Sequence, residues 1–377
     1  MAWITGVGLT PFGKLPGTDA LGLQERAANL AMDDADISAA EIDAVLVGYA
    51  TTMNHIMPAN LLAESLGIRP DLATGVNVGG ATGLAMLALA KTLVDSGSAR
   101  NVLCVGGEDR ASGQSSVAAR ATLAQVGHRN YEVPLGGNIP AFYALLASAY
   151  LTRYGLAPEA LAPLPVQMRA HAVATEGAQF RTPITVEDVR SARLIADPLT
   201  LLECCPTSDG GAAFVVSRDP RRTGVRLAGS GRANLHQHIT EADLDDVGAR
   251  RSSTLALDEA GIGVEDIDVA GVYDSFSVTL AVLLEDLGLA PAGGAGARAA
   301  AGDFAADGRL PLNTHGGLMS YGHCGVGGGM AHVVEVTRHL RGDIPPMNGR
   351  GAPRWGIVHA DGGVLSAHVT MVLEAGA

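Results

Sequence analysis

Two tyrosines and one histidine have the residue types and positions that proton transfer requires. Tyr273 directly follows an apolar, strand-like run, and Tyr321 lies among glycines two residues before His323. A tyrosine after a buried strand can simply be a core residue, whereas a tyrosine in a glycine-rich loop is harder to explain by packing. Phenol and imidazole groups both act as general acids or bases when they are held against a substrate. We therefore take Tyr273, Tyr321 and His323 as the catalytic candidates.

The remaining motifs predict neither a metal site nor a bound nucleotide cofactor. The four cysteines, with Cys204 and Cys205 adjacent, form neither a disulfide framework nor a paired zinc pattern, and we interpret these two as core thiols. The glycine run 325–329 lacks the Lys-Ser/Thr ending of a phosphate loop and the fingerprint of a pyridine-nucleotide dehydrogenase. Close helix packing explains it better.

Composition limits the class of protein. With 377 residues and 47% hydrophobic content, the chain can bury a core of two domains or of one duplicated unit. Its start shows no secretory signal, and its apolar runs are too short to span a membrane, so we expect a cytoplasmic protein. A net charge of -13 argues against a nucleic-acid surface.

An internal repeat predicts the elements that position these residues. Residues 31–43 (AMDDADISAAEID) are echoed by residues 256–268 (ALDEAGIGVEDID), and each copy leads into an apolar run, 44–48 or 269–273. A helix-spaced pattern followed by a continuous apolar run is typical of a helix feeding a buried parallel strand. We therefore predict two similar α/β halves.

The first half spans 1–222 and the second 223–377, with residues 218–222 as the expected link. Alternating helical and strand patterns favour a layered α/β fold. The predicted helices are 81–96, 141–154 and 326–340, and the predicted strands include 4–9, 101–105, 355–360 and 367–373. Residues 108–196 form a segment too long for a simple loop, so we expect an inserted loop domain.

Five segments in this order resemble the sterol-carrier-protein branch of the thiolase superfamily, over nearly the whole chain. They are 4–13 (ITGVGLTPFG), 77–83 (NVGGATG), 184–209 (ITVEDVRSARLIADPLTLLECCPTSD), 273–276 (YDSF) and 313–325 (NTHGGLMSYGHCG). The resemblance implies a pair of βαβαβαββ halves in a five-layered αβαβα arrangement with an inserted loop domain. It also implies a coenzyme A thioester as substrate.

The resemblance places Gly80 where family members carry their reactive cysteine, at the start of a buried helix. Glycine has no atom that can attack a thioester, so no acyl-enzyme can form at this position. The backbone amides of Gly80 and Ala81 remain candidate oxyanion donors, because that role needs no side chain.

Two further family cysteines are absent. In 273–276, Ser275 replaces a catalytic cysteine and Tyr273 a histidine, while His323 matches the histidine of the late glycine-histidine motif. The turn 359–363 (HADGG) matches one that begins with cysteine in many thiolases. We expect the substrate to be positioned by residues of these turns, namely Gly80, Ala81, Asp274, Ser275, His315, His359 and Gly362.

The chain is most similar to the cysteine-lacking, thiolase-like steroid side-chain aldolases of actinobacteria. That similarity implies retro-aldol cleavage of a bulky, for example steroidal, β-hydroxyacyl-CoA to a ketone and a short acyl-CoA such as propionyl-CoA. One tyrosine would act as base, and the other, or His323, would protonate the enolate. A base tyrosine needs its pKa lowered by a neighbour such as His323. The similarity also implies a homodimer and a zinc-ribbon/OB-fold partner, together a heterotetramer, with the zinc held by the partner.

Two other functions stay open. Acyl transfer or decarboxylation without a covalent intermediate also fits a site that lacks cysteine, and product analysis would separate them from aldol cleavage. A degenerate thiolase subunit without activity is the third reading. The retention of His323 beside two tyrosines argues against it.

Overall fold

A computed structural model describes residues 1–221, 224–345 and 351–376. Its strands are β1 (Trp3–Leu9), β2 (Ala44–Gly48), β3 (Leu72–Val76), β4 (Asn101–Asp109), β5 (Leu194–Ala196), β6 (Leu199–Thr200), β7 (Asp209–Ser217), β8 (Val225–Asn234), β9 (Val269–Val272), β10 (Trp355–Gly362) and β11 (Ala367–Glu374). Its α-helices are α1 (Ala20–Ala35), α2 (Pro58–Ser65), α3 (Thr82–Asp95), α4 (Ser116–Ala124), α5 (Ile139–Tyr154), α6 (Pro163–Ala174), α7 (Val186–Ser191), α8 (Ala249–Ala260), α9 (Ser277–Asp286), α10 (Ala295–Ala300), α11 (Gly317–Ser320) and α12 (Val326–Arg341).

The large sheet has the order β3-β2-β4-β7-β1-β8-β11-β10-β9. The first five strands come from the first half of the chain and the last four from the second. The halves join through β1 and β8, which pair only at Trp3 with Arg226 and Ile4 with Val225. Within each half the strand that follows the repeated helix pairs in parallel, β2 with β3 and β4, and β9 with β10.

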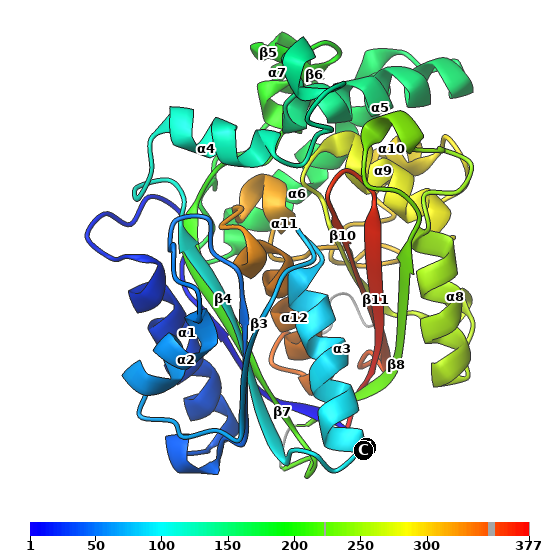
Figure 1. Cartoon of the computed structure of the whole chain (residues 1–377). Helices are drawn as coiled ribbons and strands as arrows, with labels where there is room; N and C mark the ends of the chain where they lie inside the picture. The colour runs from blue at the N-terminus through cyan, green and yellow to red at the C-terminus, as the bar shows by residue number, and fades with distance from the viewer. Residues whose placement is uncertain (222–223, 346–350, 377) are drawn as a thin grey trace.

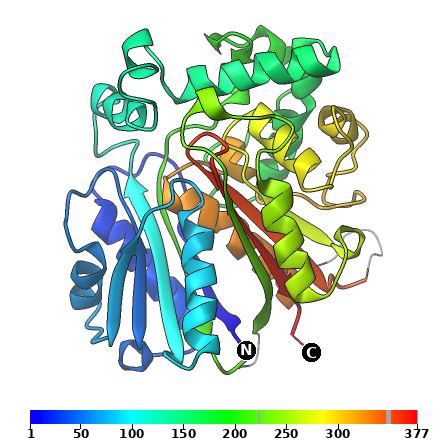
Figure 2. The ribbon, with the colours of Figure 1, turned by 45° about the vertical axis from the view of Figure 1, so that its right-hand side comes forward.

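Helices separate the two halves of the sheet and cover their outer faces. Figures 1 and 2 show α3 and α12 side by side in the centre, and each of these helices packs against strands of both halves. Helix α1 covers the first half and α8 the second. Strands buried on both faces need continuous apolar runs, which the sequence has. The result is the five-layered αβαβα arrangement that was predicted.

The repeat produces the same local structure twice. Asp36 caps the C-terminus of α1 and Gly261 that of α8, and both residues have positive φ angles, 50° and 74°. A short 3-10 turn follows each helix. In the first copy Glu41 accepts a hydrogen bond from the backbone N–H of Ser38 at 2.8 Å, and in the second Asp266 accepts one from Gly263 at 2.9 Å. Each turn leads directly into a buried strand, β2 or β9, so the predicted helix-to-strand units are confirmed.

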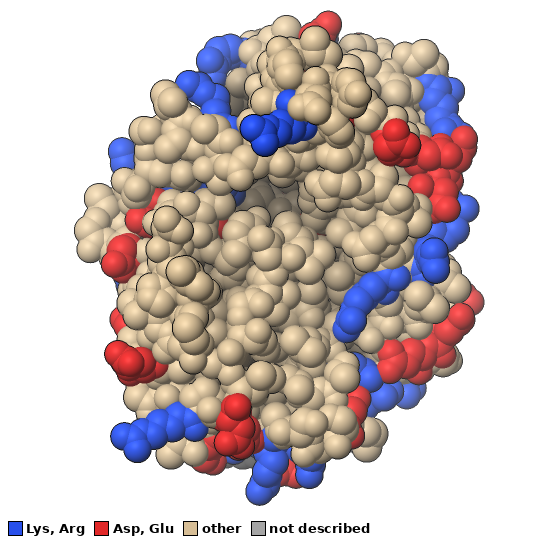
Figure 3. Space-filling view, in the orientation of Figure 1, with Lys and Arg blue, Asp and Glu red and all other residues tan. Residues whose placement is uncertain are grey.

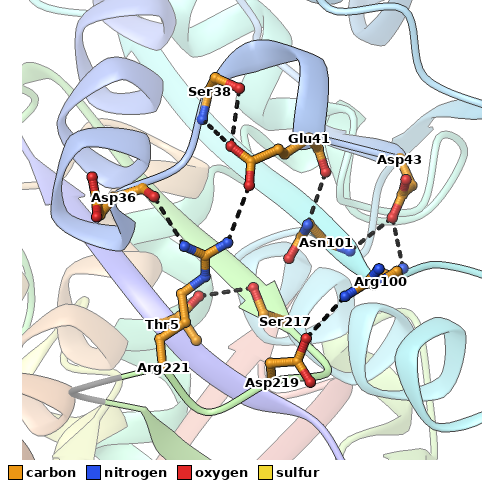
Figure 4. Close-up of polar contacts among 10 residues, drawn as sticks. All are labelled: Thr5, Asp36, Ser38, Glu41, Asp43, Arg100, Asn101, Ser217, Asp219 and Arg221. Atoms are coloured by element: carbon orange, nitrogen blue, oxygen red, sulfur yellow. Dashed lines mark hydrogen bonds and ion pairs between the residues drawn. The ribbon is translucent and has the colours of Figure 1, made fainter.

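Near the expected link, residues 218–222, polar contacts hold segments of the first half together (Figure 4). The Arg221 guanidinium donates to the backbone oxygen of Asp36 at 2.9 Å and to Glu41 at 3.4 Å. Asp43 accepts from the backbone N–H groups of Arg100 and Asn101. Residue 222 of the link lies outside the described residues.

The inserted segment follows β4 and carries α4 to α7 before the chain returns through β7. Figure 1 shows α4, α5 and α7 lying across one end of the layered body. Helix α5 begins at Ile139, two residues before the prediction, because Asn138 caps it by accepting from Ala141 N–H at 3.1 Å. Tyr143 of α5 stacks on Phe276 of the second half, with ring centroids 4.5 Å apart. None of the helices described is both long and apolar enough to cross a membrane.

Candidate active site

A cavity of about 220 Å³ lies between the insertion and the main body. The start of α3, the turn after β9, the loop before α12 and the insertion all contribute to its wall, and Figure 3 shows a hollow beneath the insertion. The lining residues are Tyr49, Gly79, Gly80, Arg110, Leu123, Val126, Ile139, Pro140, Tyr143, Cys205, Pro206, Thr207, Tyr273, Ser275, Phe276, His323, Gly325, Asp361 and Gly363. Of the ten predicted site residues, Gly80, Tyr273, Ser275 and His323 line this cavity.

Tyr273 and His323 form a hydrogen-bonded pair in the cavity wall. The Tyr273 hydroxyl lies 2.8 Å from His323 Nε2. The backbone N–H of Gly325 donates to His323 Nδ1 at 3.1 Å, so in the neutral ring the proton resides on Nε2 and is donated to Tyr273. Gly325 permits this turn because its φ of 69° lies in the left-handed region. The Tyr273 hydroxyl therefore accepts from His323, and its own proton can be donated to another acceptor.

Burial keeps both members of the pair neutral. Burial and, to a smaller extent, the nearby Arg110 charge lower the pKa of His323 to about 3. Burial also raises the pKa of Tyr273 well above its ordinary value of 10.0. The sequence-based expectation that His323 would help Tyr273 to act as a base is thus not met in this structure. A neutral phenol that accepts from a histidine is instead set up as a proton donor.

The Tyr273 hydroxyl occupies the space over Gly80. A Cβ atom added at Gly80 would overlap the Tyr273 hydroxyl and would lie 2.5 Å from the backbone oxygen of Asp361. Gly80 is held at the start of α3 by Thr82, whose hydroxyl accepts from Val78 N–H at 2.8 Å. The place of a side chain at residue 80 is therefore filled by the phenol of Tyr273.

Tyr321 is not brought to the cavity. Its hydroxyl donates to the backbone oxygen of Thr10 at 3.1 Å, and its ring contacts Phe12 with centroids 4.8 Å apart. The side chain is 4% exposed and belongs to a small apolar cluster with Cys324 and Ala331. The packing explanation that seemed weak for a glycine-rich loop is the one that the structure favours.

Five other predicted residues also lie away from the cavity lining. Asp274 accepts from Leu318 N–H at 2.7 Å and so holds the start of α11. The backbone N–H of Ala81 already donates to Val78 at 3.2 Å, which removes it as an oxyanion donor. His359 is hydrogen-bonded to Thr370 and His368. The His315 ring contacts the rings of Tyr321 and His332 at an angle, and the backbone oxygen of Gly362 accepts from Ser366. These contacts support structural roles.

The cavity residues that the sequence analysis missed include Asp361, Tyr143 and Arg110. Asp361 is 1% exposed, and its Oδ2 accepts from the Tyr143 hydroxyl at 3.1 Å. The Arg110 Nη1 lies 3.5 Å from His323 Nδ1, and its buried Nε has no hydrogen-bond partner. A charged residue at the end of an apolar strand was the available signal, for Asp361 in β10 and for Arg110 after β4.

Thiols and metal ligands add little to the site. Cys205 lines the cavity, contrary to a purely core position, but burial raises the pKa of its thiol well above the ordinary value. All four cysteines are free. Within the described part of the chain, no group of three or more His, Cys, Asp or Glu side chains is arranged to hold a metal ion.

Comparison with known proteins identifies the family. Residues 2–219 match the thiolase N-terminal domain, and residues 231–375 match the thiolase C-terminal domain-like family. The chain therefore belongs to the thiolase superfamily, whose members act on coenzyme A thioesters. Within it, the similarities described next place the chain in the thiolase-like lipid-transfer branch.

Relatives in this superfamily have different named activities. An acetyl-CoA acetyltransferase of Methanothermobacter thermautotrophicus is 31% identical over 97% of this chain and 98% of its own length. A steroid side-chain-cleaving aldolase of Thermomonospora curvata is 30% identical over 90% of each chain. The solved structure of an Ltp2-ChsH2(DUF35) aldolase matches with a TM-score of 0.84 and 29% identity, covering 99% of this chain and 97% of that one.

Proposed function

We propose that this protein cleaves a β-hydroxyacyl-CoA by a retro-aldol reaction, without a covalent intermediate. The observation that carries the proposal is the position of the Tyr273 hydroxyl, which fills the space over Gly80 and accepts a hydrogen bond from neutral His323. At the place of a side chain on residue 80, the site thus holds a proton donor, the Tyr273 hydroxyl, and no nucleophile. Retro-aldol cleavage needs such a donor, because the enolate that it releases must be protonated.

Covalent thiolase chemistry lacks a suitable nucleophile here. Gly80 has no side chain, and Ser275 bonds to Thr279 at 3.3 Å rather than to a base. Among the lining residues, Cys205 is the one thiol, and burial holds it in the protonated form, which is a poor nucleophile.

The pair has a defined role in the proposed reaction. Tyr273 donates its proton to the α-carbon of the acyl-CoA enolate, and the Nε2–H of His323 stabilises the phenolate that remains. The Arg110 guanidinium lies beside this pair and adds positive charge where negative charge develops. Because the site is buried, these electrostatic contributions are stronger than they would be in water.

The cavity wall favours an apolar acyl chain. Leu123, Val126 and Ile139 of the insertion form one side, and the stacked rings of Tyr143 and Phe276 form another. A bulky, for example steroidal, β-hydroxyacyl-CoA is the proposed substrate, with a ketone and a short acyl-CoA such as propionyl-CoA as products. The named activity of the Thermomonospora curvata relative supports this choice.

Two protein partners are part of the proposal. A second copy would pair along β3, which ends the sheet and so offers unpaired backbone groups, and the face around β3 and α3 in Figure 3 carries few charged side chains. A zinc-ribbon/OB-fold protein would dock on the insertion, and the Ltp2-ChsH2(DUF35) aldolase supports a complex with a second protein. Sedimentation equilibrium of the chain alone and with the partner tests the expected homodimer and heterotetramer.

Non-covalent acyl transfer is the second candidate. The acetyltransferase relative favours it, and the same enolate-stabilising site would serve either reaction. The two differ in products, because acyl transfer yields free coenzyme A or a new acyl ester and aldol cleavage yields a ketone.

The test is product analysis on the assembled complex. The chain would be co-purified with its zinc-ribbon/OB-fold partner and supplied with a tertiary β-hydroxyacyl-CoA, and mass spectrometry would be used to detect a ketone and a shorter acyl-CoA. Tyr273→Phe should abolish both products while the complex still assembles. A complex that binds the substrate and releases no ketone from any β-hydroxyacyl-CoA would rule the aldolase out.

A further inference from the structure

Asp361 lines the cavity, and its buried carboxyl group has one oxygen without a hydrogen-bond partner. Its Oδ2 accepts from the Tyr143 hydroxyl at 3.1 Å and from the backbone N–H of Leu365 at 3.2 Å. Its Oδ1 is buried and has no hydrogen-bond partner. Leaving a buried acceptor unpaired costs roughly 1–3 kcal/mol, so such an atom needs an explanation, for example a catalytic role or a bound water. A substrate hydroxyl would satisfy it.

The position of Asp361 fits a partner for Tyr273. Both residues line the same cavity, and both border the space over Gly80, where an added Cβ would overlap the Tyr273 hydroxyl and lie 2.5 Å from the Asp361 backbone oxygen. Two proton-carrying side chains thus belong to residues that line one cavity, and burial together with the Asp361 charge raises the pKa of Tyr273. A reaction with one deprotonation and one protonation requires two such groups.

We propose that Asp361 is the general base that removes the β-hydroxyl proton of the substrate, an assignment that rests on the retro-aldol function proposed above. The Asp361 carboxylate takes the hydroxyl proton as the carbonyl of the ketone forms. The electron pair of the Cα–Cβ bond passes into the thioester enolate. Tyr273 then gives its proton to Cα, and the proton on Asp361 later returns to the Tyr273 phenolate, so the enzyme is regenerated with no other reactant.

The surroundings of Asp361 suit this role. Burial raises the pKa of Asp361 to about 7, and the Tyr143 hydrogen bond opposes the rise. A base with a pKa near the working pH combines a useful ionised fraction with a strong pull on the proton. The titratable groups around it in the cavity and on the paired strand β11 are Tyr49, Arg110, Tyr143, Cys205, Tyr273, His323 and, opposite in register, His368.

The assignment also accounts for the two tyrosines. The pKa of Tyr273 is raised by burial, which suits an acid, and Tyr321 is bonded to Thr10 outside the cavity lining. Neither is placed to be the base. Asp361 supplies the general base, which the hydrogen-bonded pair of Tyr273 and His323 lacks.

The test is the pH dependence of kcat for ketone release by the complex. Wild type should lose activity below a midpoint near pH 7, and Asp361→Asn should lower kcat by about 10²–10⁴-fold above that midpoint, with a smaller difference at lower pH. Tyr143→Phe keeps the ring stacked on Phe276 but removes a hydrogen bond that stabilises the carboxylate, so the midpoint should move to higher pH. Tyr150→Phe is the matched control on the same helix, because its hydroxyl donates to Glu285, and its midpoint should stay in place.

The outcomes separate the two proposals. If wild type cleaves its substrate and Asp361→Asn keeps kcat within ten-fold, the base assignment is wrong and the aldolase stands. If wild type gives no ketone, both proposals fall. Should Asp361→Asn not fold, Tyr143→Phe decides, since an unshifted midpoint would contradict the role of Asp361.

Discussion

The hydroxyl of Tyr273 lies where a side chain at residue 80 would begin. The two positions therefore exclude each other: the site can hold a nucleophile at residue 80 or the phenol of Tyr273, but not both in this arrangement. The hydroxyl is held there by His323 Nε2 at 2.8 Å. The absence of a side chain at Gly80 is thus a packing requirement of the tyrosine.

The first prediction concerns stability. Gly80→Ala should destabilise the fold by about 1–3 kcal/mol, because the new methyl group overpacks against Tyr273 and the Asp361 backbone. In a Tyr273→Ala background the destabilisation by Gly80→Ala should be smaller, because the phenol is gone. It should not vanish, because the new methyl group still lies too close to the Asp361 backbone oxygen. Urea unfolding measures both values. Gly351→Ala, at a site with no heavy atom within 4 Å, is the control, and equal costs in both backgrounds would disprove the coupling.

The second prediction separates the two tyrosines. Tyr273→Phe should lower kcat by about 10²–10⁴-fold with little change in KM, because it removes the proton donor. Tyr321→Phe removes a hydrogen bond to Thr10 and should cost about 1 kcal/mol of stability while kcat stays within a few-fold. Steady-state kinetics and thermal unfolding report the two effects. A loss of kcat in Tyr321→Phe as large as in Tyr273→Phe would return Tyr321 to the active site.

The third prediction is a pH dependence of stability. The pKa of Asp361 is raised in the folded state from 3.8 to about 7, so the unfolded chain gives up this proton more readily, and stability falls as pH rises through that window. Asp361→Asn removes the penalty. The variant should therefore have a higher Tm than wild type at pH 8, and the difference should shrink at pH 4. A constant difference in calorimetry at both pH values would show that the carboxyl is ionised throughout.

The fourth prediction tests the partner surface on the insertion. Tyr131 and Leu135 are 71% and 87% exposed, which is unusual for large apolar side chains grouped on one segment. Leu135→Asp should weaken binding of the zinc-ribbon/OB-fold partner at least ten-fold in calorimetric titration. Leu255→Asp, on α8 and 49% exposed, should bind normally. Equal affinities for both variants would place the partner elsewhere.

Much of the fold was predictable because its signals are local. The repeated helix, turn and strand units depend on periodicity and on turn residues within a few positions, such as Ser38 and Glu41. The resemblance of residues 77–83 to the family motif indicated that Gly80 stands where other members carry a nucleophile. The prediction that Tyr273 and His323 belong to one site depended on a family motif, and the structure places them in contact although they are 50 residues apart.

Sequence alone determined the layered architecture, the absence of a nucleophile at Gly80 and the candidacy of Tyr273 and His323. Only the tertiary structure decided which side chains face the cavity, because that depends on packing between distant segments. Tyr321 contacts Thr10, 311 residues away, and is buried in the core. Asp361 contacts Tyr143, 218 residues away, lines the cavity and keeps one carboxyl oxygen unpaired. Neither side-chain orientation can be predicted from the neighbouring residues in the sequence. Burial and the pairing of polar groups are decided only when the layers pack together.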